Sequence, residues 1–166
     1  MLVNTTARPS RDREIFGSRL GKSFHVLSGR RFPSTVSCGS LMDVAPLVLI
    51  ADDHADTREM YSIYLAAQGL RVILAADGVT AVRMAVASRP DVIVMDLGLP
   101  VVHGAEAIRQ LKRHGGTARI PIIACTGRIE GGTAGCDAYL LKPCLPEHLL
   151  KEIRTVLARA SGQRRA

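Results

Sequence analysis

The chain has 166 residues, enough for one domain with a hydrophobic core and too few for two ordinary domains with a linker. Hydrophobic residues make up 47%, but Trp is absent and Tyr and Phe number three each, so the core must be aliphatic and stacking on nucleic-acid bases is poorly supported. No run approaches the roughly 18 apolar residues of a membrane-spanning helix, and we expect a cytoplasmic protein.

The net charge of +7 comes from the two ends of the chain. Residues 1–41 carry seven Lys and Arg against two acidic residues, and residues 159–166 contain three Arg and no acid. We therefore expect a basic, disordered extension at 1–44 and a basic tail at 161–166, and we favour solvated tails over an arm that binds polyanions. Met42 is an alternative start of translation, and a targeting presequence is another interpretation of the extension.

From residue 47 onward, short apolar runs alternate with stretches of helical pattern. The predicted elements are a strand at 47–51, a helix ending at Gln68, a strand at 71–75, a helix at Gly78–Ser88, a strand at 91–95, a helix at Gly104–His114, strands at 121–125 and 138–141, and a helix at Pro146–Ala160. The four cysteines form no C-x-x-C pair and have no His at metal-ligand spacing, so we expect them to fill core space.

Three of the four predicted helices have a predicted apolar face, and the first also has predicted ends. In the first helix we expect a cap at Asp56 or Thr57, a stop at Gly69, and a buried face of Met60, Ile63, Tyr64 and Ala67. In the second and last helices the predicted buried residues are Val79, Val82 and Val86, then Leu149, Leu150, Ile153, Val156 and Leu157.

The strands are apolar throughout rather than alternating, which is typical of a parallel sheet buried on both faces. Alternation with helices predicts a doubly wound α/β domain at residues 45–160. In such folds ligands bind at the carboxyl ends of the strands. The residues that matter most for function should therefore follow the strands.

Polar residues follow four of the five predicted strands, namely Asp52 and Asp53, Asp96, Thr126 and Lys142. Unit charges about 4 Å apart repel by roughly 4 kcal/mol at an effective dielectric near 20, so three clustered carboxylates call for a cation. Carboxylate and carbonyl oxygens suit Mg²⁺. An Asp can act as a nucleophile that forms an acyl phosphate, with a Lys and a metal neutralising charge on the phosphoryl oxygens.

The chain resembles the receiver domain of bacterial two-component response regulators in four motifs. They are LIADDHADTRE, VIVMDLGLPVVHG, IIACTG and GCDAYLLKP. The resemblance implies a five-stranded parallel sheet in the flavodoxin-like order 2-1-3-4-5. It further implies phosphorylation of Asp96, Mg²⁺ bound by Asp53, Asp52, Asp96 and the carbonyl of Gly98, a phosphate-binding Lys142 before a commonly cis peptide to Pro143, and a switch pair of Thr126 and Tyr139.

Two residues and the length of one segment depart from the family pattern. His103 stands where Asp is frequent, and Cys144 where Phe is frequent. Only 13 residues separate Thr126 from Tyr139, and the Gly-rich GRIEGGTAG between them predicts a shortened fourth helix. This puts the usual dimer and the usual signalling surface in doubt. His54 and His103, which could suggest zinc or a general base, are interpreted as surface loop residues.

We expect a stand-alone phosphoacceptor that signals and is not otherwise an enzyme. Its partners would be a sensor histidine kinase or histidine phosphotransfer protein and an unknown downstream protein, with no direct DNA binding, no membrane, and a monomer or weak dimer. The main alternative is a receiver-fold module that binds without phosphorylation. A Mg²⁺-dependent phosphohydrolase would need a second acid two residues after Asp96, where Gly98 stands, and a flavin domain would need a Gly-rich phosphate loop.

Overall fold

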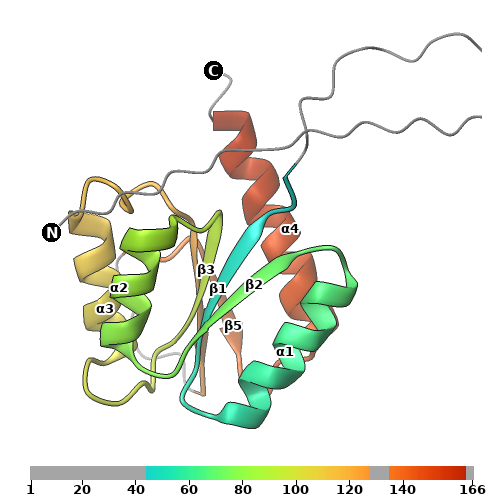
Figure 1. Cartoon of the computed structure of the whole chain (residues 1–166), viewed down its shortest axis with the longest axis horizontal. Coiled ribbons are helices and arrows are strands. Elements are labelled where there is room, and N and C mark those ends of the chain that lie inside the picture. Colours follow the sequence, from blue (N-terminus) through green and yellow to red (C-terminus); the bar gives the residue numbers. More distant parts are fainter. Residues whose placement is uncertain (1–43, 128–134, 164–166) are drawn as a thin grey trace, which may run out of the picture. The chain divides into compact units, whose positions relative to one another are not determined.

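A computed structural model describes residues 44–127 and 135–163, in which strands and helices alternate (Figure 1). The elements are β1 (Leu47–Ala51), α1 (Ala55–Ala67), β2 (Arg71–Ala75), α2 (Gly78–Ser88), β3 (Val92–Asp96), α3 (Gly104–Arg113), β4 (Ile122–Thr126), β5 (Ala138–Leu141) and α4 (Pro146–Gln163). All nine elements were predicted, with bounds that differ by three residues at most where both ends were predicted.

The five strands form one parallel sheet in the order β2-β1-β3-β4-β5, which confirms the predicted topology. Strands β1, β3 and β4 are buried along their whole length, as their continuous apolar sequences predicted. The chain order reverses between β1 and β3, so the carboxyl ends of these two central strands form the switch point at which α/β folds bind ligands.

Two helical layers cover the sheet (Figure 1). Helices α1 and α4 pack on one face, where Leu65 and Ile153 join side chains such as Ile50 and Val94 in a core cluster. Helices α2 and α3 pack on the other, in a second cluster around Leu49, Ile93, Met95 and Ile108. Nearly all of these side chains are aliphatic, as the shortage of aromatic residues required.

The predicted apolar face of α1 is largely wrong. Of its four residues, only Tyr64 packs against the core. Tyr61 and Leu65 are the buried residues of this helix, whereas Ile63 keeps 64% of its area exposed and Met60 44%. The helix begins at Ala55, so the capping position belongs to His54, without a side-chain cap, and not to Asp56 or Thr57. The sequence of this helix contains two apolar stripes. The stripe that contains Tyr61 and Leu65 faces the core, and most of the predicted stripe does not.

The face of α2 is corrected in the same way, whereas that of α4 is confirmed. Ala81 and Ala85 of α2 are fully buried, and Val82 packs against the same core cluster as predicted. Val79 and Val86, in contrast, are exposed. In α4, Leu149, Leu150, Ile153 and Val156 are buried and Leu157 packs against them. The predicted shortening of the helix between Thr126 and Tyr139 falls largely on residues 128–134, outside the described residues.

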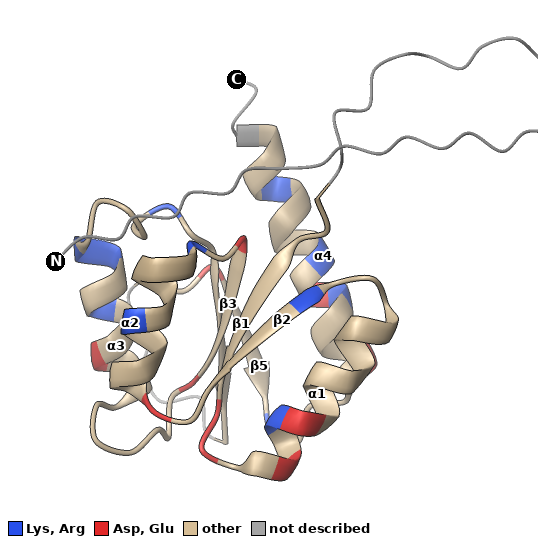
Figure 2. Ribbon diagram, in the orientation of Figure 1, with Lys and Arg blue, Asp and Glu red and all other residues tan. Residues whose placement is uncertain are grey.

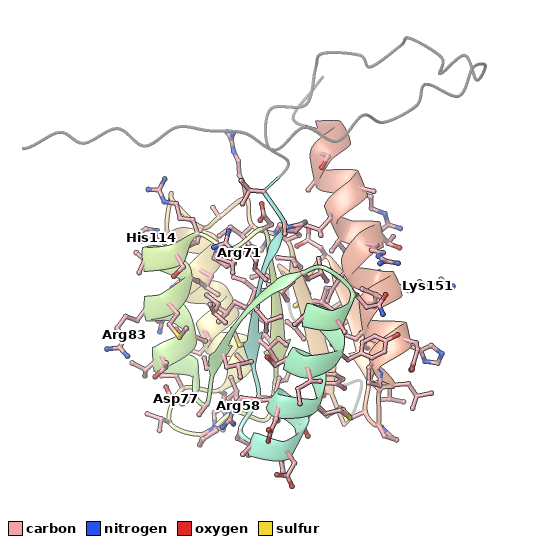
Figure 3. All side chains as sticks on the ribbon, turned by 45° about the vertical axis from the view of Figure 1, so that its right-hand side comes forward. Arg58, Arg71, Asp77, Arg83, His114 and Lys151 are labelled. Carbon is pink, nitrogen blue, oxygen red and sulfur yellow. The ribbon has the colours of Figure 1, made fainter. Side chains whose placement is uncertain are left out.

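Charged residues are unevenly distributed between the two ends of the sheet (Figure 2). Most of the acidic residues near the sheet lie where the strands end, although Asp91 and Asp137 lie where strands begin. In Figure 3, Asp77 and the labelled Arg58 lie near the carboxyl end of the sheet, whereas Arg71 and His114 lie near the amino end. The carboxyl end is therefore the place to look for the carboxylate chemistry predicted from the sequence.

Candidate phosphorylation site

Three strands deliver the central residues of the site. Asp52 follows β1, Asp96 is the last residue of β3, and Lys142 follows β5. The prediction had placed Asp96 and Thr126 just after their strands, but each is the final residue of its strand. Both acids are buried, with only 3% of Asp52 and 6% of Asp96 exposed. Buried carboxylates require partners, which the remaining contacts provide.

Lys142 joins the two buried carboxylates. Its Nζ donates to Oδ2 of Asp52 and to Oδ2 of Asp96, each at 2.6 Å. Burial lowers the pKa of Lys142, but the hydrogen bonds that it donates to Asp52 and Asp96 outweigh this effect and raise the pKa above its ordinary value. The side chain is therefore an ammonium ion that offsets the repulsion between two acids.

Backbone amides hold the other carboxylate oxygens. The N–H of His54 donates to Oδ1 of Asp52 at 2.9 Å, and the N–H of Gly98 donates to Oδ1 of Asp96 at 2.8 Å. Each carboxylate therefore has one oxygen on Lys142 and the other on a main-chain donor. The arrangement fixes the orientation of both side chains before any ligand binds.

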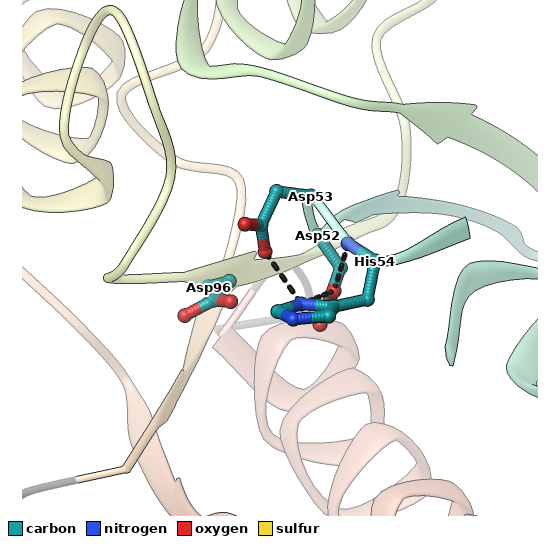
Figure 4. Close-up of side chains that lie close together, drawn as sticks. All are labelled: Asp52, Asp53, His54 and Asp96. Atoms are coloured by element: carbon teal, nitrogen blue, oxygen red, sulfur yellow. Dashed lines mark hydrogen bonds and ion pairs between the residues drawn. The ribbon is translucent and has the colours of Figure 1, made fainter. Parts of the chain in front are cut away.

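Asp53 and His54 form the exposed rim of the same site (Figure 4). The His54 Nδ1 lies 2.7 Å from Oδ1 of Asp53 and 3.4 Å from Oδ1 of Asp52. Among the described residues, Asp52, Asp53, His54 and Asp96 offer ligand atoms within 4.8 Å of one another. His54 is 70% exposed, as predicted for a surface residue, and His103 is likewise exposed at the start of α3.

The donor set of this cluster suits a hard divalent cation. Three carboxylates at the ends of adjacent strands offer oxygen atoms to one point, and two of them are already oriented by main-chain amides. Mg²⁺ prefers such oxygen ligands and commonly binds through one or two carboxylates. The residues present therefore fit a magnesium ion.

Two glycines allow the loop after β3 to pack closely, which sequence reasoning missed. A Cβ atom on Gly104 would lie 2.0 Å from the backbone oxygen of Asp96. A Cβ atom on Gly78 would lie 2.2 Å from the backbone oxygen of Val102. The helices α2 and α3 can approach the Asp96 loop only because these positions lack side chains. The signal was present in the sequence as a Gly at the first position of each helix.

A third missed contact involves Arg58 on α1. Its Nη1 donates to the backbone carbonyl of Asp52 at 2.6 Å, so a cationic side chain stabilises the backbone of the acidic segment. The residue belongs to the LIADDHADTRE motif, but spacing alone does not indicate that its side chain turns back toward the strand.

The predicted switch residues lie on neighbouring strands. Thr126 is buried at the end of β4, and Tyr139 of β5 pairs with Ala124 of β4 and is 44% exposed. Alternation of side chains along strands places Thr126 and Tyr139 on the same face of the sheet. The peptide between Lys142 and Pro143 is cis, as the resemblance implied.

Cys125 lies beside Asp96 in the sheet register and is buried, as expected for a core-filling residue. Burial raises the pKa of this thiol to about 12. The thiol therefore does not compete with the neighbouring carboxylate as a nucleophile at physiological pH.

Residues 48–154, more than half of the chain, match the response regulator receiver domain. The chain belongs to this family. Two curated relatives of the receiver are the DNA-binding dual master transcriptional regulator RpaA of Synechocystis and the response regulator MprA of Mycobacterium ulcerans. RpaA is 37% identical over 120 residues, and MprA is 38% identical over 118 residues. The alignments cover 69% and 68% of this chain, which spans about half the length of each relative.

Solved receiver structures share the fold. A CheY-like receiver from Methanospirillum hungatei matches with a TM-score of 0.68 at 23% identity, covering 72% of this chain and 98% of that one. The receiver domain of the sensor histidine kinase PA1611 from Pseudomonas aeruginosa, whose structure has a magnesium ion in its active-site cleft, matches with a TM-score of 0.65 at 32% identity. That match covers 69% of this chain and 98% of the other.

The family membership defines the class of function. Receiver domains are phosphoacceptors of two-component signalling, and their acidic site binds Mg²⁺. None of the described helices is long and apolar enough to cross a membrane.

Proposed function

We propose that Asp96 accepts a phosphoryl group from a histidine of a sensor kinase or phosphotransfer protein. The observation that carries this proposal is the shared contact of Lys142, whose Nζ lies 2.6 Å from both Asp52 and Asp96. Through this contact, charged residues at the ends of β1, β3 and β5 form one cluster. A helix cap would account for one acid, but not for two buried acids that share one lysine.

The transfer exchanges one bond to phosphorus for another. A carboxylate oxygen of Asp96 attacks the phosphorus atom, and the phosphorus–nitrogen bond to the donor imidazole breaks. The electron pair of that bond returns to the imidazole, which departs neutral because its other nitrogen carries a proton. The product is an acyl phosphate on Asp96.

Asp53, Asp52, Asp96 and the carbonyl of Gly98 would hold Mg²⁺. When bound, the ion supplies positive charge against the phosphoryl oxygens. Lys142 performs a related task from the protein itself, because its ammonium ion already faces Asp96 and can pair with a phosphoryl oxygen attached there. Asp53 is the most accessible of the three acids, and we assign it as a direct ligand.

Thr126 and Tyr139 would pass the chemical change to a protein-binding surface. The Thr126 hydroxyl can donate a hydrogen bond to a phosphoryl oxygen, and Tyr139 lies on the same face of the sheet one strand away. The modified state is favoured only through contacts that differ between two conformations, and the 44% exposed Tyr139 is accessible to a partner protein.

A groove beside the site gives a protein donor access. It has a volume of about 470 Å³ and is lined in part by His54, Met60 and Lys142. Met60 is an exposed apolar residue of α1, suitable for contact with another helix. The donor and the downstream target are both proteins in this proposal, and DNA is not contacted by the receiver itself.

The proposal extends to the organisation of the chain. The receiver would occupy residues 45–160, between a basic extension at 1–44 and a short basic tail at 161–166 in a cytoplasmic protein. Helix α4 supports a slightly longer domain, because it continues to Gln163.

The test is the intact mass of the protein after incubation with acetyl phosphate and Mg²⁺. We expect one phosphoryl adduct in the wild type, and none with EDTA or in Asp96→Ala. Beryllofluoride binding, followed by NMR, detects a competent site even when the phosphoryl group is short-lived. A folded wild type that shows neither adduct nor beryllofluoride binding would contradict the proposal and favour a phosphorylation-independent binding module.

A further inference from the structure

Tyr61 connects helix α1 with the loop that carries Lys142. Only 3% of Tyr61 is exposed, and its ring packs in the core cluster between the sheet and helices α1 and α4. Its hydroxyl donates a hydrogen bond to the backbone carbonyl of Cys144 at 2.8 Å, across 83 residues of sequence. The contact therefore ties the loop after β5 to a different element of the fold.

The direction of this hydrogen bond is fixed by chemistry. A backbone carbonyl can only accept, so the phenol must donate. Burial, with smaller contributions from neighbouring thiols and Asp52, raises the pKa of Tyr61 well above its ordinary value. The hydroxyl keeps its proton throughout the physiological range and so remains able to donate this hydrogen bond.

The same loop is held at its other end by the sheet. The N–H of Lys142 donates to the carbonyl of Thr126 at 2.8 Å. The segment from Lys142 to Cys144 is therefore fixed by β4 at one end and by Tyr61 at the other. Between these supports the Lys142 side chain extends to Asp52 and Asp96, at 2.6 Å from each.

We infer that Tyr61 is a positioning residue for Lys142, acting through the main chain of the loop. This inference rests on the proposed role of Asp96 and Lys142 in phosphoryl transfer. Because the lysine must meet charge that develops on the phosphoryl group, a small displacement of its backbone weakens transition-state stabilisation. The competing explanation is that Tyr61 only satisfies its own buried hydroxyl within the core.

The variant Tyr61→Phe removes the hydroxyl and leaves the ring. We expect the initial rate of phosphorylation by acetyl phosphate to fall about threefold to tenfold, the factor that one hydrogen bond contributes. Tyr64→Phe is the matched control, because Tyr64 is half-buried on the same helix and its hydroxyl makes no hydrogen bond within the described residues. The control should phosphorylate at the wild-type rate.

A double-mutant cycle distinguishes positioning from a general structural effect. In a Lys142→Ala background, Tyr61→Phe should cause no further loss of rate, because the group that it positions is gone. NMR gives a second readout that needs no activity, since Tyr61→Phe should shift the Lys142 amide resonance and Tyr64→Phe should not.

Three results would overturn the inference. They are a wild-type rate in Tyr61→Phe, an unshifted Lys142 amide, or the same fold-loss with and without Lys142. Each of them leaves phosphorylation of the wild type intact, so the proposed function would survive. Absence of phosphorylation and of beryllofluoride binding in the wild type would instead remove both the proposed function and this inference.

Discussion

The two ends of the sheet use carboxylates in different ways. At the carboxyl end, Asp52 and Asp96 are buried next to each other and share the Lys142 ammonium ion. At the amino end, Asp91 accepts a hydrogen bond from the N–H of Leu47, and Asp137 accepts one from the N–H of Ile122. The first pair is a concentrated charge cluster. The second is two separate caps on the first residues of strands, of which Asp137 also pairs with Lys112 at 3.2 Å.

This difference shows what marks a reactive end of an α/β sheet. An acid near a strand terminus is an ordinary structural feature when its partner is a backbone amide close to the strand start. It indicates chemistry when acids from adjacent strands converge and need an added cation. The amino end also carries exposed Arg residues, such as Arg71 and Arg119, for which the described residues provide no ion pair.

The largest expected effect comes from removing the shared cation. Lys142→Ala should lower the rate of phosphorylation by acetyl phosphate about a hundredfold, as loss of one stabilising donor does in other active sites. The affinity for Mg²⁺, measured by calorimetry, should rise, because an ammonium ion no longer repels the metal. Lys151→Ala, on the exposed face of α4, is the control and should change neither quantity. A Lys142→Ala variant with unaltered kinetics would mean that the shared contact is only structural.

A second prediction concerns the packing that supports the carboxyl end. Gly104→Ala places a methyl group against the backbone of Asp96, and the free energy of unfolding in urea should fall by about 1–3 kcal/mol. The phosphorylation rate should fall as well, because Asp96 and Gly98 must shift. Gly115→Ala is the control, since no atom lies within 4 Å of its added Cβ. Equal stability of the two variants would show that the loop adapts without strain.

The sequence pattern was sufficient for the strands and the residues at their ends, and the family resemblance supplied the sheet order. Buried parallel strands are continuous apolar runs, and the polar residue that ends each run is conspicuous. Helix faces were harder to predict, because α1 and α2 each contain two apolar stripes. In α2 the sheet accepts Ala81 and Ala85, whose small size permits close approach, and the larger Val79 is left exposed.

The contacts that orient the site could not be predicted from spacing. Neither Tyr61 nor Arg58 was predicted to have a role, although the side chain of each contacts the backbone of a segment that carries site residues. Such contacts depend on where a side chain crosses from a helix to a loop far away in sequence. Residue types at strand ends indicate which groups react, whereas the three-dimensional structure is needed to identify the groups that hold them.

A third prediction tests the purely structural role of acids at the amino end. Asp91→Ala should lower the free energy of unfolding by about 1 kcal/mol, because the Leu47 amide loses its acceptor. Asp91→Asn keeps an acceptor oxygen and should recover most of that loss. Both variants should be phosphorylated at the wild-type rate. A slower rate in either of them would show that the amino end is coupled to the site.

The smallest effect is expected from the exposed Arg residues. Strands of five residues span about 16 Å, roughly twice the screening length in physiological salt, so charges at the amino end act only weakly on the site. The double variant Arg71→Ala, Arg119→Ala should therefore keep its phosphorylation rate and Mg²⁺ affinity at 150 mM salt and change stability by less than about 0.5 kcal/mol. The same measurements in low salt are the sharper comparison, because weaker screening extends the reach of these charges. A salt-independent loss of phosphorylation would require a contact between the ends of the sheet that acts through packing instead of charge.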